Sequence, residues 1–142
     1  MAYNVLDVSK FIINYSNRKN YDIQMLKLQK LLYFIQAYFI CNTKKRCFKE
    51  KIEAWEFGPV IPEVFEEYKQ FGNTNIPADS FDEKEISRTH RKMIKDVIKE
   101  FKDHSITQVT KITQNQTPWQ KAYKPNEKNE ITLGSIKEFF NE

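Results

Sequence analysis

The chain has 142 residues, of which 40% are hydrophobic, 14% aromatic and 30% charged, and its formal net charge is +4. Eleven Phe, seven Tyr and two Trp supply enough large apolar side chains for a hydrophobic core, which excludes a disordered tail and a low-complexity linker. Only three glycines are present and none belongs to a phosphate-binding motif, so a nucleotide-binding loop is not expected.

Apolar residues at helical spacing predict a mainly helical bundle of about six or seven helices, with one short extended segment or a small two-stranded pairing. No linker or internal repeat divides the chain, so we expect one domain over residues 1–142. The first helix is predicted over residues 5–17. The second, over residues 23–41, follows Asp22 as a candidate N-cap and carries apolar stripes on two nearly opposite sides. We therefore expect this second helix to be packed on both faces and central to the fold.

Residues 52–57 alternate in part between apolar and polar residues and then meet Gly58-Pro59. This pattern predicts a short extended segment ended by a turn. Pro62 suits the first turn of a helix over residues 62–71, because its missing N–H would be unpaired there. Gly72 can supply the left-handed C-cap of that helix.

The second half of the chain contains further helical patterns. Acids precede bases in the first of these patterns, an order that complements the helix dipole. Ser105 is a candidate N-cap for the next helix, and Thr117 is a candidate N-cap for a short helix. The predicted helices cover residues 83–103, 106–114 and 133–141, with the short helix opened by Pro118 and Trp119.

Three polar side chains, Gln29, Tyr33 and Gln36, share a border between the two apolar stripes of the second helix. Their spacing places them on one side of the helix, within reach of one another. Two interpretations are open: the side chains are hydrogen-bonded inside the domain, which we favour, or they face a partner. They are our first candidates for a partner contact.

The net charge is concentrated in one short connection. Residues 44–51 contain five basic residues and one acid, which accounts for the whole excess, so Lys44, Lys45 and Arg46 are the second candidates for a partner contact. The stretch that follows is acidic, and a later helix is basic. Such alternation is typical of solvated faces and not of one continuous basic surface, so nucleic acid is not an expected partner.

No constellation of residues indicates catalysis or metal binding. Cys41 and Cys47 have neither paired C-x-x-C spacing nor a nearby His, so we expect two free thiols, no metal site and no cofactor. Glu53 and Glu56 flank Trp55, where burial would raise a carboxyl pKa and permit acid–base chemistry. A solvated acid beside a packed indole is the favoured interpretation, so we expect that the chain is not an enzyme.

The most apolar run of the chain, residues 31–41, is interrupted by Gln36 and is far shorter than the ~20 residues that span a bilayer. The first residues contain no basic region followed by an apolar stretch, so no signal peptide is indicated. We therefore expect a cytoplasmic protein without membrane insertion.

Several blocks of the sequence resemble, in order along the chain, the Panacea or SocA-like antitoxin family. The first block is the run K-L-Q-K-L-L-Y-F at residues 27–34, and the second is I-E-A-W-E-F-G-P-V-I-P at residues 52–62. Gln114 is a departure, because the family often has His there; a hydrogen-bonding role survives, whereas a role that needs a titrating imidazole is put in doubt. The remaining similar positions are Thr113, Pro118, Trp119 and a closing helix at residues 136–140.

The resemblance implies a compact, mostly helical antitoxin of a bacterial, prophage or other mobile-element system, which binds and neutralises a cognate protein toxin encoded by an adjacent gene. Two alternatives stay open: an adaptor that delivers the toxin to a AAA+ protease, and a DNA-binding regulator of its own operon. The family-motif residues are interpreted as structural, and they are Leu28, Leu31, Leu32, Ala54, Trp55, Gly58, Pro59, Val60, Pro62, Thr113, Pro118 and Trp119.

Overall fold

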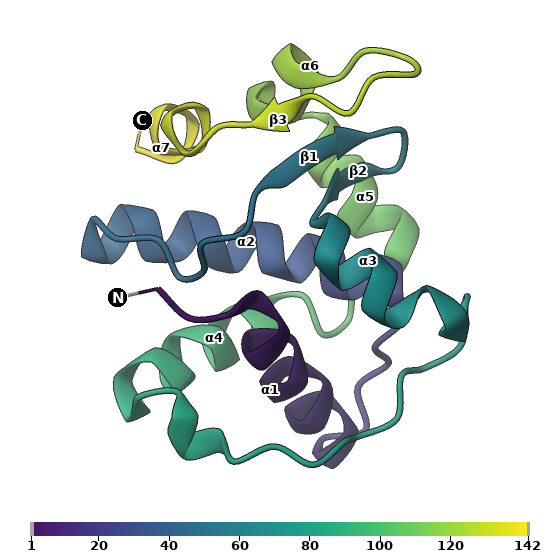
Figure 1. Cartoon of the computed structure of the whole chain (residues 1–142), viewed down its shortest axis with the longest axis vertical. Coiled ribbons are helices and arrows are strands. Elements are labelled where there is room, and N and C mark those ends of the chain that lie inside the picture. Colours follow the sequence, from purple (N-terminus) through teal and green to yellow (C-terminus); the bar gives the residue numbers. More distant parts are fainter. Residues whose placement is uncertain (1, 142) are drawn as a thin grey trace.

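Helices make up most of the chain in the computed structural model, which describes residues 2–141 (Figure 1). The predicted mainly helical class is confirmed, and a small antiparallel sheet accompanies the helices. The helices are α1 (Val5–Arg18), α2 (Met25–Thr43), α3 (Pro62–Tyr68), α4 (Arg88–Glu100), α5 (Ile106–Gln114), α6 (Thr117–Ala122) and α7 (Leu133–Phe140). The strands are β1 (Ile52–Trp55), β2 (Gly58–Val60) and β3 (Glu130–Ile131), and two 3-10 turns are η1 (Lys69–Phe71) and η2 (Glu83–Glu85).

Helix α2 is the centre of the molecule. Fourteen of its nineteen residues are buried, and it contacts α1, α3, α4, α5, α7 and β2. In Figure 1 the sheet lies on one side of α2, and α1 and α4 lie on the other. This arrangement confirms the prediction of a central helix with two packed faces, because both apolar stripes are covered by other elements.

The sheet has the strand order β2-β1-β3, and both pairings are antiparallel. Trp55 pairs with Gly58 across the turn that joins β1 to β2, and Ile52 pairs with Ile131 of β3. The predicted two-stranded pairing is therefore extended by a third strand. A strand of two residues is too short to show an alternating pattern, which is why the sequence did not indicate it.

The predicted starts of α2 and α4 are wrong. Asp22 does not cap α2: the N-cap is Gln24, and the Asp22 carboxylate accepts a hydrogen bond from Asn75 Nδ2 at 3.2 Å instead. Helix α4 begins at Arg88 and not near residue 83, because Ile86 is extended and Ser87 caps the helix through a bond from His90 N. No acid lies in the first turn of α4, so the expected complement to its dipole is absent there.

Of the other predicted helix ends, one agrees with the sequence and two differ from it. Ser105 caps α5 in a reciprocal capping box with Gln108, as its position predicts. Thr117 is the first residue of α6 and not its cap, because the preceding Gln116 occupies the N-cap position. Gly72 ends η1 with a positive φ of 54°, although its ψ of −126° lies outside the left-handed helical region.

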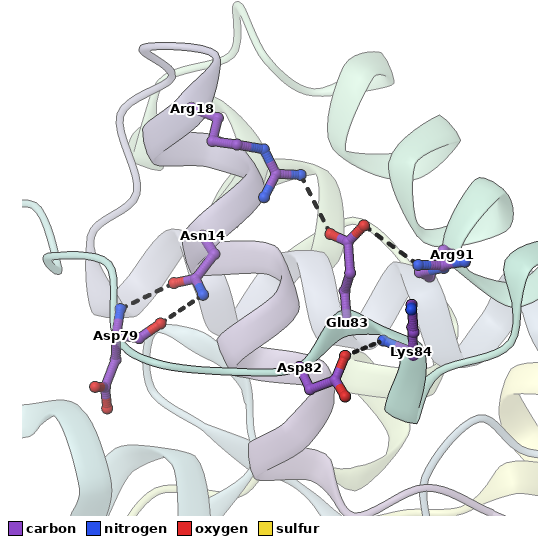
Figure 2. A network of polar contacts seen from close by, with 7 residues as sticks. All are labelled: Asn14, Arg18, Asp79, Asp82, Glu83, Lys84 and Arg91. Carbon is purple, nitrogen blue, oxygen red and sulfur yellow. Dashed lines mark hydrogen bonds and ion pairs between the residues drawn. The ribbon is translucent and has the colours of Figure 1, made fainter.

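The long connection before α4 is fixed to two helices by polar contacts (Figure 2). Asn14 on α1 exchanges two hydrogen bonds with the backbone of Asp79, at 2.6 and 3.0 Å. The Glu83 carboxylate lies between the guanidinium groups of Arg18 on α1 and Arg91 on α4, at 3.6 and 3.2 Å. These contacts attach an otherwise irregular segment to the helical core.

Gly58→Ala is expected to lower the free energy of unfolding by roughly 2 kcal/mol or more, because a side chain there combines backbone strain with overpacking. Gly58 has φ 103°, and a Cβ at this position would lie 2.9 Å from both Lys30 Cε and Thr113 Oγ1. Gly72→Ala is the matched control, since Gly72 also has positive φ but no atom lies within 4 Å of its Cβ position. Urea unfolding of both variants measures the difference, and equal losses would show that Lys30 and Thr113 do not constrain Gly58.

Candidate functional site

Four buried polar side chains form a row along α2 and make hydrogen bonds to neighbouring segments. They are Gln29, Lys30, Tyr33 and Gln36. Gln36 lies at the C-terminal end of this row, where Nε2 donates to Phe48 O at 2.8 Å. Its Oε1 accepts from Cys47 N at 2.7 Å and from Phe48 N at 3.3 Å. One amide therefore satisfies three backbone groups of a connection that has no regular structure of its own.

Gln29, at the N-terminal end of the row, also binds main-chain groups. Its Oε1 accepts from Ile61 N at 2.7 Å, and its Nε2 donates to Ile61 O at 3.2 Å, which fixes the junction between β2 and α3. Between the two glutamines, the Tyr33 hydroxyl donates to Gln116 Oε1 at 2.7 Å, at the start of α6. Burial raises the pKa of Tyr33, so this hydroxyl keeps its proton and acts as a donor.

Gln29, Tyr33 and Gln36 are at most 1% exposed. Their surroundings match the favoured interpretation, polar groups that are hydrogen-bonded inside the domain. The alternative, that these three side chains face a partner, is corrected: other elements cover each of them, and their polar atoms are already engaged.

Lys30 belongs to the same row and was missed as a site residue. Its side chain is fully buried, and Nζ donates to Pro59 O at 3.2 Å. Burial lowers the pKa of this amine to about 7. The sequence signal was a lysine within the run K-L-Q-K-L-L, but a lysine beside an apolar stripe normally extends its amine to water. Here Gly58 and Pro59 of β2 lie against the Lys30 side chain.

The turn between β1 and β2, Glu56-Phe57, is held by side chains of α5 and α6. Gln114 Nε2 donates to Glu56 O at 3.0 Å, and Trp119 Nε1 donates to Trp55 O at 2.8 Å. Gln114, at the position where the resemblance predicts His, thus makes a hydrogen bond that does not need an imidazole.

The other motif residues occupy packed positions, which supports our interpretation that they are structural. Thr113 is buried and donates to Thr110 O at 2.7 Å, and Pro62 occupies the first turn of α3. Pro118 lies in the first turn of α6. The remaining motif residues that are buried are Leu28, Leu31, Leu32, Ala54, Gly58, Pro59 and Val60.

Lys44, Lys45 and Arg46 form the turn that follows α2, and all three are exposed. Lys44 adopts the left-handed conformation at φ 63°, and its N–H donates to Ile40 O. At 1.5 Å per residue, this basic turn lies about 20 Å along the helix axis from Lys30 and the β1–β2 turn. The basic turn and the β1–β2 turn are therefore at different ends of α2.

The two glutamates considered for acid–base chemistry, Glu53 and Glu56, have different surroundings. Glu53 Oε1 accepts a hydrogen bond from Trp55 Nε1 at 2.8 Å, whereas the Glu56 side chain is exposed.

Cys41 and Cys47 are both free thiols. Within residues 2–141, no three His, Cys, Asp or Glu side chains gather in a way that would hold a metal ion. None of the helices in this range has the length and apolar character needed to cross a bilayer.

The family model "Antitoxin SocA-like, Panacea domain" matches residues 28–120, about two thirds of the chain. The matched region begins in α2, includes the β1–β2 turn and ends within α6. A search of curated proteins and a search of solved structures each found no match.

The stability that depends on Lys30 is expected to rise with pH. Its pKa is about 7 in the folded chain and 10.5 ordinarily, so between these values the unfolded chain binds a proton that the folded chain lacks. We expect the free energy of unfolding of the wild type, minus that of Lys30→Met, to increase from about pH 7 to about pH 10. Urea unfolding of both proteins across this window is the measurement, and a flat difference would contradict the buried neutral amine.

Proposed function

The chain belongs to the SocA-like antitoxin, Panacea domain family, and we propose that it binds and neutralises a cognate protein toxin. The observation that carries this proposal is the family match over residues 28–120. That region contains the polar row of α2, the β1–β2 turn and Trp119. It therefore includes most of the contacts that hold the sheet against the central helix.

Neutralisation of this kind needs a complementary surface and no catalytic group. A stable complex between two proteins commonly buries about 800 Å² on each partner, which is enough to cover the working part of a small toxin. We accordingly propose a non-enzymatic role, in agreement with antitoxin family membership. The family also implies that the partner is a toxin, and we propose that an adjacent gene encodes it.

The basic turn is the candidate contact that remains from the sequence. Lys44, Lys45 and Arg46 are exposed together at the end of a rigidly packed helix, so their charges are presented at a fixed place on the surface. We propose that they contact an acidic or nucleotide-binding face of the toxin. Exposed charges of this kind act more on the rate of association than on the strength of the complex.

Co-expression with the product of the adjacent gene tests the proposed function. We expect that product alone to arrest growth, and this chain to restore growth and to co-purify with it in a fixed ratio. Rescue without a stable complex, with the toxin disappearing in a protease-dependent way, would replace direct neutralisation by delivery to a AAA+ protease. A harmless neighbour that does not bind would reject this pairing.

Charge reversal of the basic turn, Lys44→Glu with Lys45→Glu and Arg46→Glu, is expected to weaken growth rescue. The association rate with the toxin should fall by about tenfold at low salt and by less at high salt, because salt screens exposed charges. Stopped-flow or surface-based kinetics at two salt concentrations measure this effect. An unchanged association rate at low salt would exclude the basic turn from the interface.

A further inference from the structure

Phe57 is a large apolar side chain that the fold leaves in water. It is 59% exposed, and among residues 2–141 it is the one large hydrophobic side chain that is exposed and not buried or half-buried. A single exposed apolar residue is ordinary on a protein surface and does not indicate a binding site by itself. Phe57 is distinguished by its setting and not by its exposure alone.

The backbone that presents Phe57 is held on both sides. Gln114 and Trp119 donate hydrogen bonds to the carbonyl oxygens of Glu56 and Trp55, at 3.0 and 2.8 Å. On the other side, Gly58 is packed against Lys30 and Thr113 so closely that a Cβ would lie 2.9 Å from each. A turn fixed in this way loses little conformational entropy when a partner binds, which favours affinity.

Partly exposed aromatic rings surround the turn. Trp119 stacks on Tyr123 with ring centroids 4.6 Å apart, and Trp55 meets Phe65 edge to face at 5.1 Å. Trp55, Glu56 and Tyr123 line one open hollow with residues 125–128, directly beside the β1–β2 turn, and Figure 1 shows this loop and α6 next to β1. Trp and Tyr are the residue types enriched among the strongest contacts of protein interfaces.

The segment that contains Phe57 is acidic. Residues 52–68 contain five glutamates and no lysine or arginine. Glu56 and Glu127 border the hollow, where the cation is Lys128, whose Nζ lies 5.1 Å from the centre of the Trp55 ring. Lys69, the first base after the acidic segment, pairs with Glu66 at 2.9 Å. Among the residues that line the hollow, the two acids Glu56 and Glu127 therefore exceed the one base, Lys128, and a partner of complementary charge is basic.

From these observations we infer that the β1–β2 turn docks against a basic face of the toxin, with Phe57 inserted into an apolar pocket of that face and Glu56 and Glu127 beside its Lys or Arg side chains. The inference rests on the proposed function and adds the chemistry of the partner. It places an aromatic anchor at the centre of the contact and charges at its rim, as in other protein interfaces.

The test measures binding of the purified chain to the product of the adjacent gene by titration calorimetry. Phe57→Ala is expected to raise the Kd by about tenfold or more and to leave the thermal unfolding midpoint unchanged, because the side chain is mostly exposed. Phe139→Ala is the matched control: it is the same substitution on a partly exposed residue of α7, which Figure 1 shows away from the turn, and its Kd should equal that of the wild type.

Glu56→Lys supplies a second arm that does not depend on the Phe57 variant. We expect it to slow association, and more strongly at low salt than at high salt. Wild-type binding with unchanged Kd for Phe57→Ala and unchanged association for Glu56→Lys would overturn the inference and leave the proposed function standing. Absence of both rescue and binding by the wild type would overturn the proposed function, and the inference with it. A dimer of this chain that Phe57→Ala abolishes, with toxin binding unaffected, would assign the surface to a second copy and also overturn the inference.

Discussion

Hydrogen bonds from buried polar side chains of α2 to the backbone of irregular segments are the constraint on which the rest of the structure depends. Gln29 and Gln36 each supply a donor and an acceptor to main-chain groups of residues 61 and 47–48, which lie outside the helices and strands. A buried backbone group left unpaired costs about 1–3 kcal/mol, so these side chains make the enclosed course of the chain possible. The junction of β2 with α3 and the connection at residues 47–48 are attached to the central helix in this way.

The central helix and several helix ends were predictable because they depend on nearby residues. The two apolar stripes of α2 and the Ser105 cap of α5 are local patterns of the sequence, and both are found in the structure. Strand β3 and the burial of Lys30 were not predictable, since each depends on segments far apart in the chain. The start of α4 was misplaced because charge order indicated a helix, whereas the extended Ile86 interrupts it.

The candidate site was predicted in part, for the same physical reason. The sequence identified Gln29, Tyr33 and Gln36 as a unit, since their helical spacing is local, but their partners lie 11 to 83 residues away along the chain. Polar residues at the edge of an apolar stripe suit either a buried network or an interface, and only tertiary packing decides between them. The exposed basic turn and the acidic β1–β2 region were both visible in the sequence as runs of charge. Only the three-dimensional structure shows that they lie at different ends of α2.

The bonds that hold the β1–β2 turn have a consequence for how this surface can change over evolutionary time. Gln114 and Trp119 bind main-chain carbonyl oxygens, and these oxygens are present whatever side chains stand at positions 56 and 57. Substitution of Glu56 or Phe57 therefore removes none of these bonds, and the turn keeps its shape. The side chains that hold the turn are thus distinct from Glu56 and Phe57, so substitutions at these two positions can alter the displayed surface while both main-chain bonds stay in place.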